Sequence, residues 1–124
     1  MAKNEIYKDG SDLSVTVSHP TSPVSGDPVR YGELVGVATV TEDTDGKTSV
    51  TFKGVHLLSV KGIDGSGNSA VAVGDKLYYV DADTPVLSKK ATGRFAGHAV
   101  EAPGYSGTLV ASGATTAIPV RLSN

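Results

Sequence analysis

The sequence contains no cysteine and no tryptophan, and aromatic residues make up only 6% of its 124 positions. Without cysteine the chain can form neither disulfides nor thiolate metal sites, so its stability must come from packing or from binding to partners. No apolar run approaches the roughly 18 residues that a membrane-spanning helix needs. The polar residues 1–5 indicate neither a signal peptide nor an anchor. We therefore expect a protein made in the cytoplasm with no membrane partner.

Clusters of basic residues are also lacking. The 11 Lys and Arg are scattered among 13 Asp and Glu, and the formal net charge is −2. Nucleic-acid binding requires Lys and Arg gathered so that they neutralise several phosphates at once. We therefore expect no nucleic-acid partner.

The residues that are abundant indicate short strands and tight turns. Hydrophobic residues account for 39% of the chain and there are 15 glycines, which is too apolar for a disordered segment. Residues 13–18 alternate between apolar and polar, which is typical of a half-buried strand. The sequence predicts an all-β fold, a small compact barrel or sandwich. We expect an N-terminal arm of residues 1–12 and a single β-barrel-like domain of residues 13–124.

Further strands and turns follow from apolar runs and from Gly, Asp and Asn clusters. Strands are expected at 34–40, 47–53, 55–60, 77–80, 86–87, 94–101 and 116–122, with turns at 42–46 and 64–68 and a loop at 102–114. Pro119 has no N–H to donate, so the last strand is expected at an edge or a bulge.

The chain carries an internal repeat. Residues 24–31 match 72–79, residues 32–38 match 93–99, and residues 48–52 match 116–120. The second copy has an extra hairpin, residues 80–92. Two related halves of short strands indicate a barrel or sandwich with pseudo-two-fold symmetry.

Two turns in the repeat are predicted to be structural. They consist of Gly26 with Asp27 and Gly74 with Asp75, because glycine allows a sharp turn and an Asp carboxylate can accept backbone N–H groups. Gly36 and Gly97, within strands, suggest bulges or a close approach of two backbones.

Candidate residues for chemistry are few. His19, His56 and His98 lie far apart in the sequence, whereas zinc needs three or four converging ligands. We interpret His56 and His98 as structural and His19, in a proline-rich loop, as solvated. We predict no metal ion and no cofactor.

Acidic residues could in principle serve as a catalytic pair or as calcium ligands. Asp81 and Asp83 are separated by one residue, as a hydrolytic pair could be, but Thr84-Pro85 favours a turn. Residues 42–46 resemble the start of a calcium loop without its twelfth-position ligand. We interpret both stretches as turns and predict no catalytic site.

Several motifs, taken in order, resemble a known family. They are the opening Met-Ala-Lys-Asn-Glu-Ile-Tyr, Gly26-Asp27-Pro28-Val29, Gly32-x-Leu34-Val35-Gly36-Val37-Ala38, Val60-Lys61-Gly62, Val73-Gly74-Asp75-Lys76-Leu77-Tyr78-Tyr79, Leu87-Ser88-Lys89-Lys90-Ala91-Thr92-Gly93 and Ile118-Pro119-Val120-Arg121-Leu122. Their order and spacing resemble those of the capsid cement, or decoration, proteins of tailed bacteriophages. The loop at 103–114 is longer than the family pattern.

The resemblance implies a virion structural protein on the outer surface of the phage head. Such proteins clamp neighbouring subunits of the major capsid protein, commonly as homotrimers, and have no catalytic activity. Within the arm, Ile6 and Tyr7 form an apolar pair in a polar stretch. We therefore predict that Asn4, Glu5, Ile6 and Tyr7 contact the capsid, with an ordinary first strand as the alternative.

Two other functions remain open from the sequence. A carbohydrate-binding surface module would use an exposed aromatic pair drawn from Tyr31, Tyr79 and Tyr105. A small-barrel enzyme would need a deep pocket with a strongly perturbed carboxylate.

Overall fold

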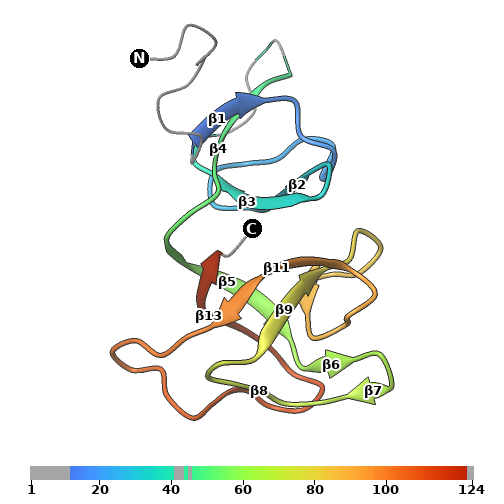
Figure 1. Ribbon diagram of the computed structural model, residues 1–124, viewed down its shortest axis with the longest axis vertical. Helices are drawn as coiled ribbons and strands as arrows, with labels where there is room; N and C mark the ends of the chain where they lie inside the picture. Colours follow the sequence, from blue (N-terminus) through green and yellow to red (C-terminus); the bar gives the residue numbers. More distant parts are fainter. Residues whose placement is uncertain (1–11, 41–43, 45, 123–124) are drawn as a thin grey trace, which may run out of the picture.

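The computed structural model describes residues 12–40, 44 and 46–122, and every regular element in these ranges is a β-strand (Figure 1). The predicted all-β class is therefore confirmed. None of the described residues forms a helix that is long and apolar enough to cross a membrane. Residues 1–11 and most of the predicted 42–46 turn lie outside the described ranges, so the arm stays a prediction.

The first half of the chain forms a four-stranded antiparallel sheet. Its strands, in the spatial order β1-β4-β3-β2, are β1 (Asp12–Val15), β4 (Thr48–Thr51), β3 (Leu34–Ala38) and β2 (Pro28–Tyr31).

The second half forms a closed barrel with two small appended sheets. The barrel strands, in spatial order, are β10 (Leu87–Ser88), β5 (Val55–Lys61), β13 (Thr115–Leu122), β11 (Arg94–Ala99) and β9 (Lys76–Tyr79). The appended pairs are β6 (Ile63–Asp64) with β7 (Gly67–Asn68), and β8 (Val71–Ala72) with β12 (Thr108–Val110). Because β12 lies within residues 102–114, the prediction of a strandless loop there is wrong.

The strand β3 joins the two halves because both of its faces are buried. Val35 and Val37 pack into the cluster that also fills the barrel, beside residues such as Leu77 and Val120. The opposite face carries Ala38, which belongs to the small cluster of the first sheet. Successive side chains of a strand point to opposite faces, so a strand buried on both sides needs the continuous apolar run found at 34–38. In Figure 1 the sheet occupies one end of the molecule and the barrel the other.

The two halves share one strand arrangement. In each half the first strand pairs with the fourth, the fourth with the third and the third with the second, giving β1-β4-β3-β2 and β5-β13-β11-β9. The register also agrees at the start of the second strand, since Val29 lies opposite Gly36 and Leu77 lies opposite Gly97.

The turns before these second strands form the same hydrogen bonds in both halves. The Asp27 carboxylate accepts the N–H of Val24 at 2.9 Å, and the Asp75 carboxylate accepts the N–H of Ala72 at 2.8 Å. The turn glycines, Gly26 and Gly74, have φ angles of 94° and 93°, which favour glycine. Their N–H groups donate to Ala38 and Ala99, at 2.8 and 2.7 Å.

The third match of the sequence repeat is shifted by two residues from its predicted alignment. Ala38 lies opposite Val50, and the equivalent Ala99 lies opposite Val120. Val50 therefore corresponds to Val120, where the sequence had matched it to Ile118. Side chains in a strand repeat with period two, so a shift of two keeps the same residues buried and the apolar pattern could not reveal it.

Pro119 lies in β13, a barrel strand with neighbours on both sides, and not at an edge or a bulge as predicted. The strand β13 pairs with β5 along its whole length and with β11 on its other side. The Pro119 carbonyl accepts the N–H of Val100 at 3.1 Å, just beyond the end of β11 at Ala99. Because the N–H and C=O of one residue point to the same side of a strand, the missing donor of Pro119 falls where the β11 ladder has ended.

Gly36 and Gly97 occupy equivalent positions where two backbones come close together. A Cβ atom built on Gly36 would lie 2.6 Å from the carbonyl oxygen of Thr51, and one on Gly97 would overlap the carbonyl of Arg121. The ladder between β11 and β9 also shifts register between Phe95 and Gly97. These two glycines allow the third and fourth strands to pack this closely.

We predict that Gly97→Ala lowers the free energy of unfolding by about 2–3 kcal/mol, because the added methyl group would meet backbone that cannot move without disturbing β13. Urea denaturation measures the change. Gly65→Ala is the matched control, since a Cβ there meets nothing within 4 Å. Equal stability of the two variants would contradict the close approach.

Candidate functional site

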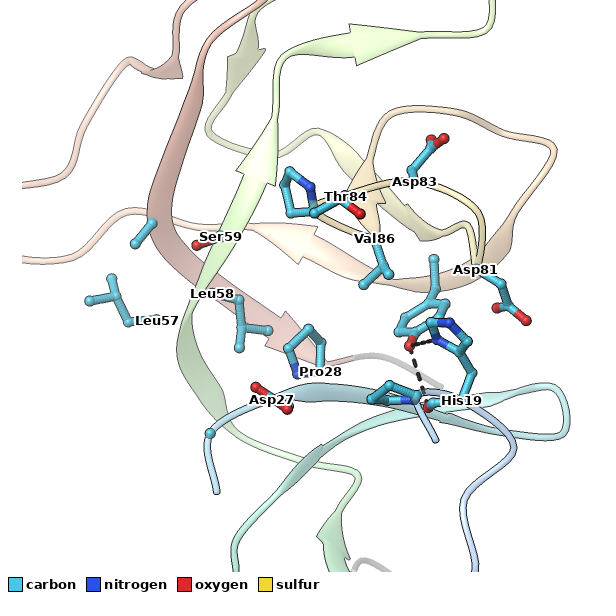
Figure 2. Close-up of a pocket in the computed structure, with 15 residues that line it drawn as sticks. His19, Asp27, Pro28, Leu57, Leu58, Ser59, Asp81, Asp83, Thr84 and Val86 are labelled. Atoms are coloured by element: carbon cyan, nitrogen blue, oxygen red, sulfur yellow. Dashed lines mark hydrogen bonds between the residues drawn. The ribbon is translucent and has the colours of Figure 1, made fainter. Parts of the chain in front are cut away.

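An open cleft of about 440 Å³ lies between the first half of the chain and the barrel. Residues 19–20 and 26–28 form one wall, and residues 57–59 of β5 form another (Figure 2). The connection from β9 to β10 contributes Asp81, Asp83 and residues 84–86. The cleft combines apolar and proline side chains with carboxylates, and neither Lys nor Arg lines it.

His19, which lines the cleft, links the first half of the chain to Tyr79 of the barrel. Its Nδ1 atom lies 2.6 Å from the hydroxyl oxygen of Tyr79, and the two rings meet edge to face at 5.7 Å (Figure 2). Tyr79 is fully buried, and burial raises the pKa of its phenol well above the usual range, with a further contribution from the nearby Asp81 carboxylate. Tyr79 is therefore a neutral hydroxyl. The prediction that His19 is solvated is wrong, because the histidine is half-buried and hydrogen-bonded.

An ion pair makes a second link between the halves. The Arg30 guanidinium donates from Nε and one terminal nitrogen to the two carboxylate oxygens of Asp81, at 2.9 and 2.7 Å. The Arg30 side chain is 15% exposed and that of Asp81 is 37% exposed. The hydrogen bonds from Arg30 lower the pKa of the Asp81 carboxyl against the opposing effect of burial.

The two neighbouring aspartates do not form a hydrolytic pair. Asp81 is held by Arg30, whereas Asp83 pairs with Lys90 at 3.0 Å. Their side chains point in different directions (Figure 2). A paired-carboxylate hydrolase needs one member that keeps a proton as the general acid, and separate cation partners oppose this. The geometry agrees with the interpretation of residues 81–85 as a turn.

The other two histidines lie in separate environments. His98 is half-buried and contacts the ring of Phe95 at 5.4 Å, and the Nε2 atom of His56 lies 2.9 Å from the carbonyl oxygen of Lys53. Within the described ranges, no three His, Asp or Glu side chains come together as metal ligands.

The exposed aromatic pair that a carbohydrate-binding module would use loses one of its three candidate residues. Tyr79 has no exposed surface, so its assignment to an exposed pair is wrong. Tyr31 is exposed and Tyr105 is half-buried. The predicted capsid-contact residues Asn4, Glu5, Ile6 and Tyr7 lie outside the described residues.

The sequence did not reveal the cleft itself. Its β5 wall comes from Leu57 and Leu58, which are adjacent and therefore point to opposite faces of the strand. Leu58 is buried in the barrel and Leu57 is 57% exposed. This apolar pair was the available signal, because one of two adjacent leucines in a barrel strand must face outward. The residues of the other walls come from distant parts of the chain and could not be brought together from spacing alone.

We predict that Tyr79→Phe lowers the free energy of unfolding by about 1–2 kcal/mol, because it removes the hydroxyl that bonds His19 across the cleft. Tyr78→Phe is the control, since the half-buried Tyr78 ring packs edge to face on Phe95 and does not reach His19. Thermal unfolding of the two variants measures the difference. A Tyr79→Phe variant as stable as Tyr78→Phe would show that the link contributes nothing.

A second prediction concerns pH. The pKa of Asp81 is lower in the folded than in the unfolded protein, so the unfolded chain takes up this proton first as the pH falls. The ion pair therefore stabilises the protein above the unfolded pKa of about 3.9, and this contribution is lost as the pH falls through the lower, folded value. Since the carboxylate is partly exposed, we expect Asp81→Asn to cost about 1 kcal/mol at pH 7.

Urea denaturation of both proteins between pH 7 and pH 2.5 tests this prediction. The other carboxyl groups titrate alike in the two proteins, so the stability difference isolates Asp81. It should shrink toward zero at the acidic end. A difference that does not change with pH would contradict the assignment.

Comparison with known proteins supplies the context for this geometry. No curated protein and no solved structure matches the chain. A family model described as phage cement protein matches residues 7–117, a range that holds every residue that lines the cleft and all of the second half up to the start of β13. The match indicates a structural component of the virion capsid and not a class of enzyme. The chain belongs to the phage cement protein family.

Proposed function

We propose that this chain binds the outer surface of the phage head and stabilises the capsid by clamping neighbouring subunits of the major capsid protein. The observation that carries the proposal is the family match over residues 7–117. After synthesis in the host cytoplasm, the protein would join the head as a structural component. No chemical step is required of it.

The distribution of exposed apolar side chains supports a clamp. In the first half, Tyr31 and Leu34 are cross-strand neighbours and are 38% and 40% exposed. In the second half, Val55 and Leu57 on β5 are 54% and 57% exposed. Exposed apolar groups favour burial against a partner. Two such pairs in different halves of one chain offer two contact areas, which is what a clamp between two subunits needs.

Multivalent attachment would raise the strength of binding beyond that of either contact alone. Once one area is bound, the second binds at a high effective concentration. Assembly into homotrimers, which the family resemblance implies, would multiply the contacts again. We include the trimer in the proposal.

The predicted arm belongs to the same proposal. Asn4, Glu5, Ile6 and Tyr7 would contact the capsid, with Ile6 and Tyr7 supplying apolar surface in an otherwise polar stretch. An extended arm can pair its main chain with the edge of a partner sheet.

We predict that deleting residues 2–10 reduces binding to expanded phage heads at least tenfold, because the arm's contacts are lost. Co-sedimentation of purified protein with expanded and unexpanded heads measures binding, and circular dichroism checks the fold. Replacing only Lys3 and Lys8 with alanine is the control for loss of charge. Unchanged binding by the deleted, folded protein would overturn the role of the arm, whereas absence of binding by the intact chain would overturn the proposed function.

A further inference from the structure

The strand β5 has one fully paired edge and one edge that is mostly open. On one side it pairs with β13 from Val55 to Lys61. On the other side its pairing in the described structure is a single parallel bridge, between Val60 and Leu87 of β10. The barrel is therefore closed at the end of β5 nearer to Lys61 and open beside residues 55–59.

The hydrogen-bond pattern shows which backbone groups face the open edge. The Leu122 N–H donates to the Gly54 carbonyl at 3.0 Å, and the Gly62 N–H donates to the Ala114 carbonyl at 2.8 Å. Residues 54 and 62 therefore direct their polar groups toward β13. Because these groups alternate sides along a strand, the even-numbered residues of β5 do the same. The N–H and C=O groups of Val55 and Leu57 point the opposite way, and neither residue has a backbone partner on that side among the described residues.

The open edge borders the cleft. Leu57, Leu58 and Ser59 are wall residues of the cleft, and Pro28 and Val86 stand across from them (Figure 2). Val55 and Leu57, whose backbone groups are unpaired, also carry the two most exposed large apolar side chains in the described ranges. Unpaired backbone groups and exposed apolar side chains thus occur on the same two residues.

This combination fits an extended polypeptide. Alternating N–H and C=O groups along an open edge match the main chain of an added strand. The side chains of that strand would lie beside Val55 and Leu57 on the outer face of the sheet. Five residues of edge span about 16 Å, and the cleft volume of about 440 Å³ is within the range of ligand-binding clefts.

The charge of the cleft favours a basic partner. Three aspartates, Asp27, Asp81 and Asp83, line it and no Lys or Arg does. Asp81 pairs with Arg30 and Asp83 pairs with Lys90, whereas the Asp27 carboxylate accepts a backbone N–H. A Lys or Arg side chain on the bound segment would find Asp27 opposite β5.

We propose that an extended segment of the major capsid protein, with apolar side chains and at least one basic residue, binds in this cleft as an added strand along residues 55–59 of β5. The inference rests on the proposed function and specifies how the second half of the chain holds the capsid.

The first test compares Leu57→Pro with Leu57→Ala. Both variants remove the exposed leucine side chain, but only proline removes the N–H that faces the cleft. The β13 ladder is spared, because the Leu57 N–H points away from it. We expect Leu57→Pro to bind expanded heads at least tenfold more weakly than Leu57→Ala, measured by co-sedimentation, with both variants folded by circular dichroism.

The second test does not depend on a proline variant folding. Because the chain has no cysteine, Ser59→Cys places a single thiol in the cleft, and Ser66→Cys, in the exposed turn between β6 and β7, is the control. Maleimide labelling of Ser59→Cys should slow at least tenfold when the protein is bound to heads, while labelling of Ser66→Cys changes less than twofold.

The outcomes separate the inference from the proposed function. If the unmodified chain does not bind heads, the proposed function fails and the inference falls with it. If the chain binds heads but Leu57→Pro binds as Leu57→Ala does, or Ser59→Cys stays reactive on heads, the inference alone is overturned. Protection of Ser59→Cys in the free protein, with oligomers in solution, would identify a second copy of this chain as the occupant and also overturn it.

Discussion

The position of β13 between β5 and β11 is the constraint on which the rest of the structure depends. A strand with neighbours on both sides forms backbone hydrogen bonds with both of them. In β13, Pro119 has no N–H to donate, and it lies opposite Val100, just beyond the end of β11. Gly97 allows the β13 backbone to come close. The equivalent Gly36 allows the same approach in the first sheet. In each half the fourth strand therefore lies between the first and the third, and the second strand pairs with the third.

The two halves differ in what pairs with the outer edge of the second strand, which is β2 in the first half and β9 in the second. In the second half β10 lies between β9 and β5 and closes the barrel. In the first half the only counterpart in the described structure is the isolated bridge between His19 and Arg30 at the edge of β2. The same short segment supplies the hydrogen bond to Tyr79 and pairs with the strand that carries the partner of Asp81. The edge of the first sheet is thus linked to the barrel, while β5, paired with β10 at Val60, has an open edge beside residues 55–59.

Residues with a local physical signature were predictable from the sequence. The apolar run at 34–40 predicted a strand, which the structure has as β3 at Leu34–Ala38, and the glycines within strands predicted the close contacts at Gly36 and Gly97. Properties that depend on distant residues were not predictable. His19 carries no local sign that a tyrosine 60 residues away will bond it. Likewise the two-residue shift between Val50 and Val120 leaves the burial pattern unchanged.

The two polar links across the cleft have a mechanical consequence. They join residues that are 51 and 60 positions apart in the chain, and both end near the start of the β9–β10 connection. A pull that separates the halves would stretch the Arg30–Asp81 and His19–Tyr79 bonds together, and neither could break without loading the other. The shared valine core at β3 would resist the same pull by staying out of water. Separation of the sheet from the barrel is thus opposed both by the two short polar links and by the apolar contact at β3.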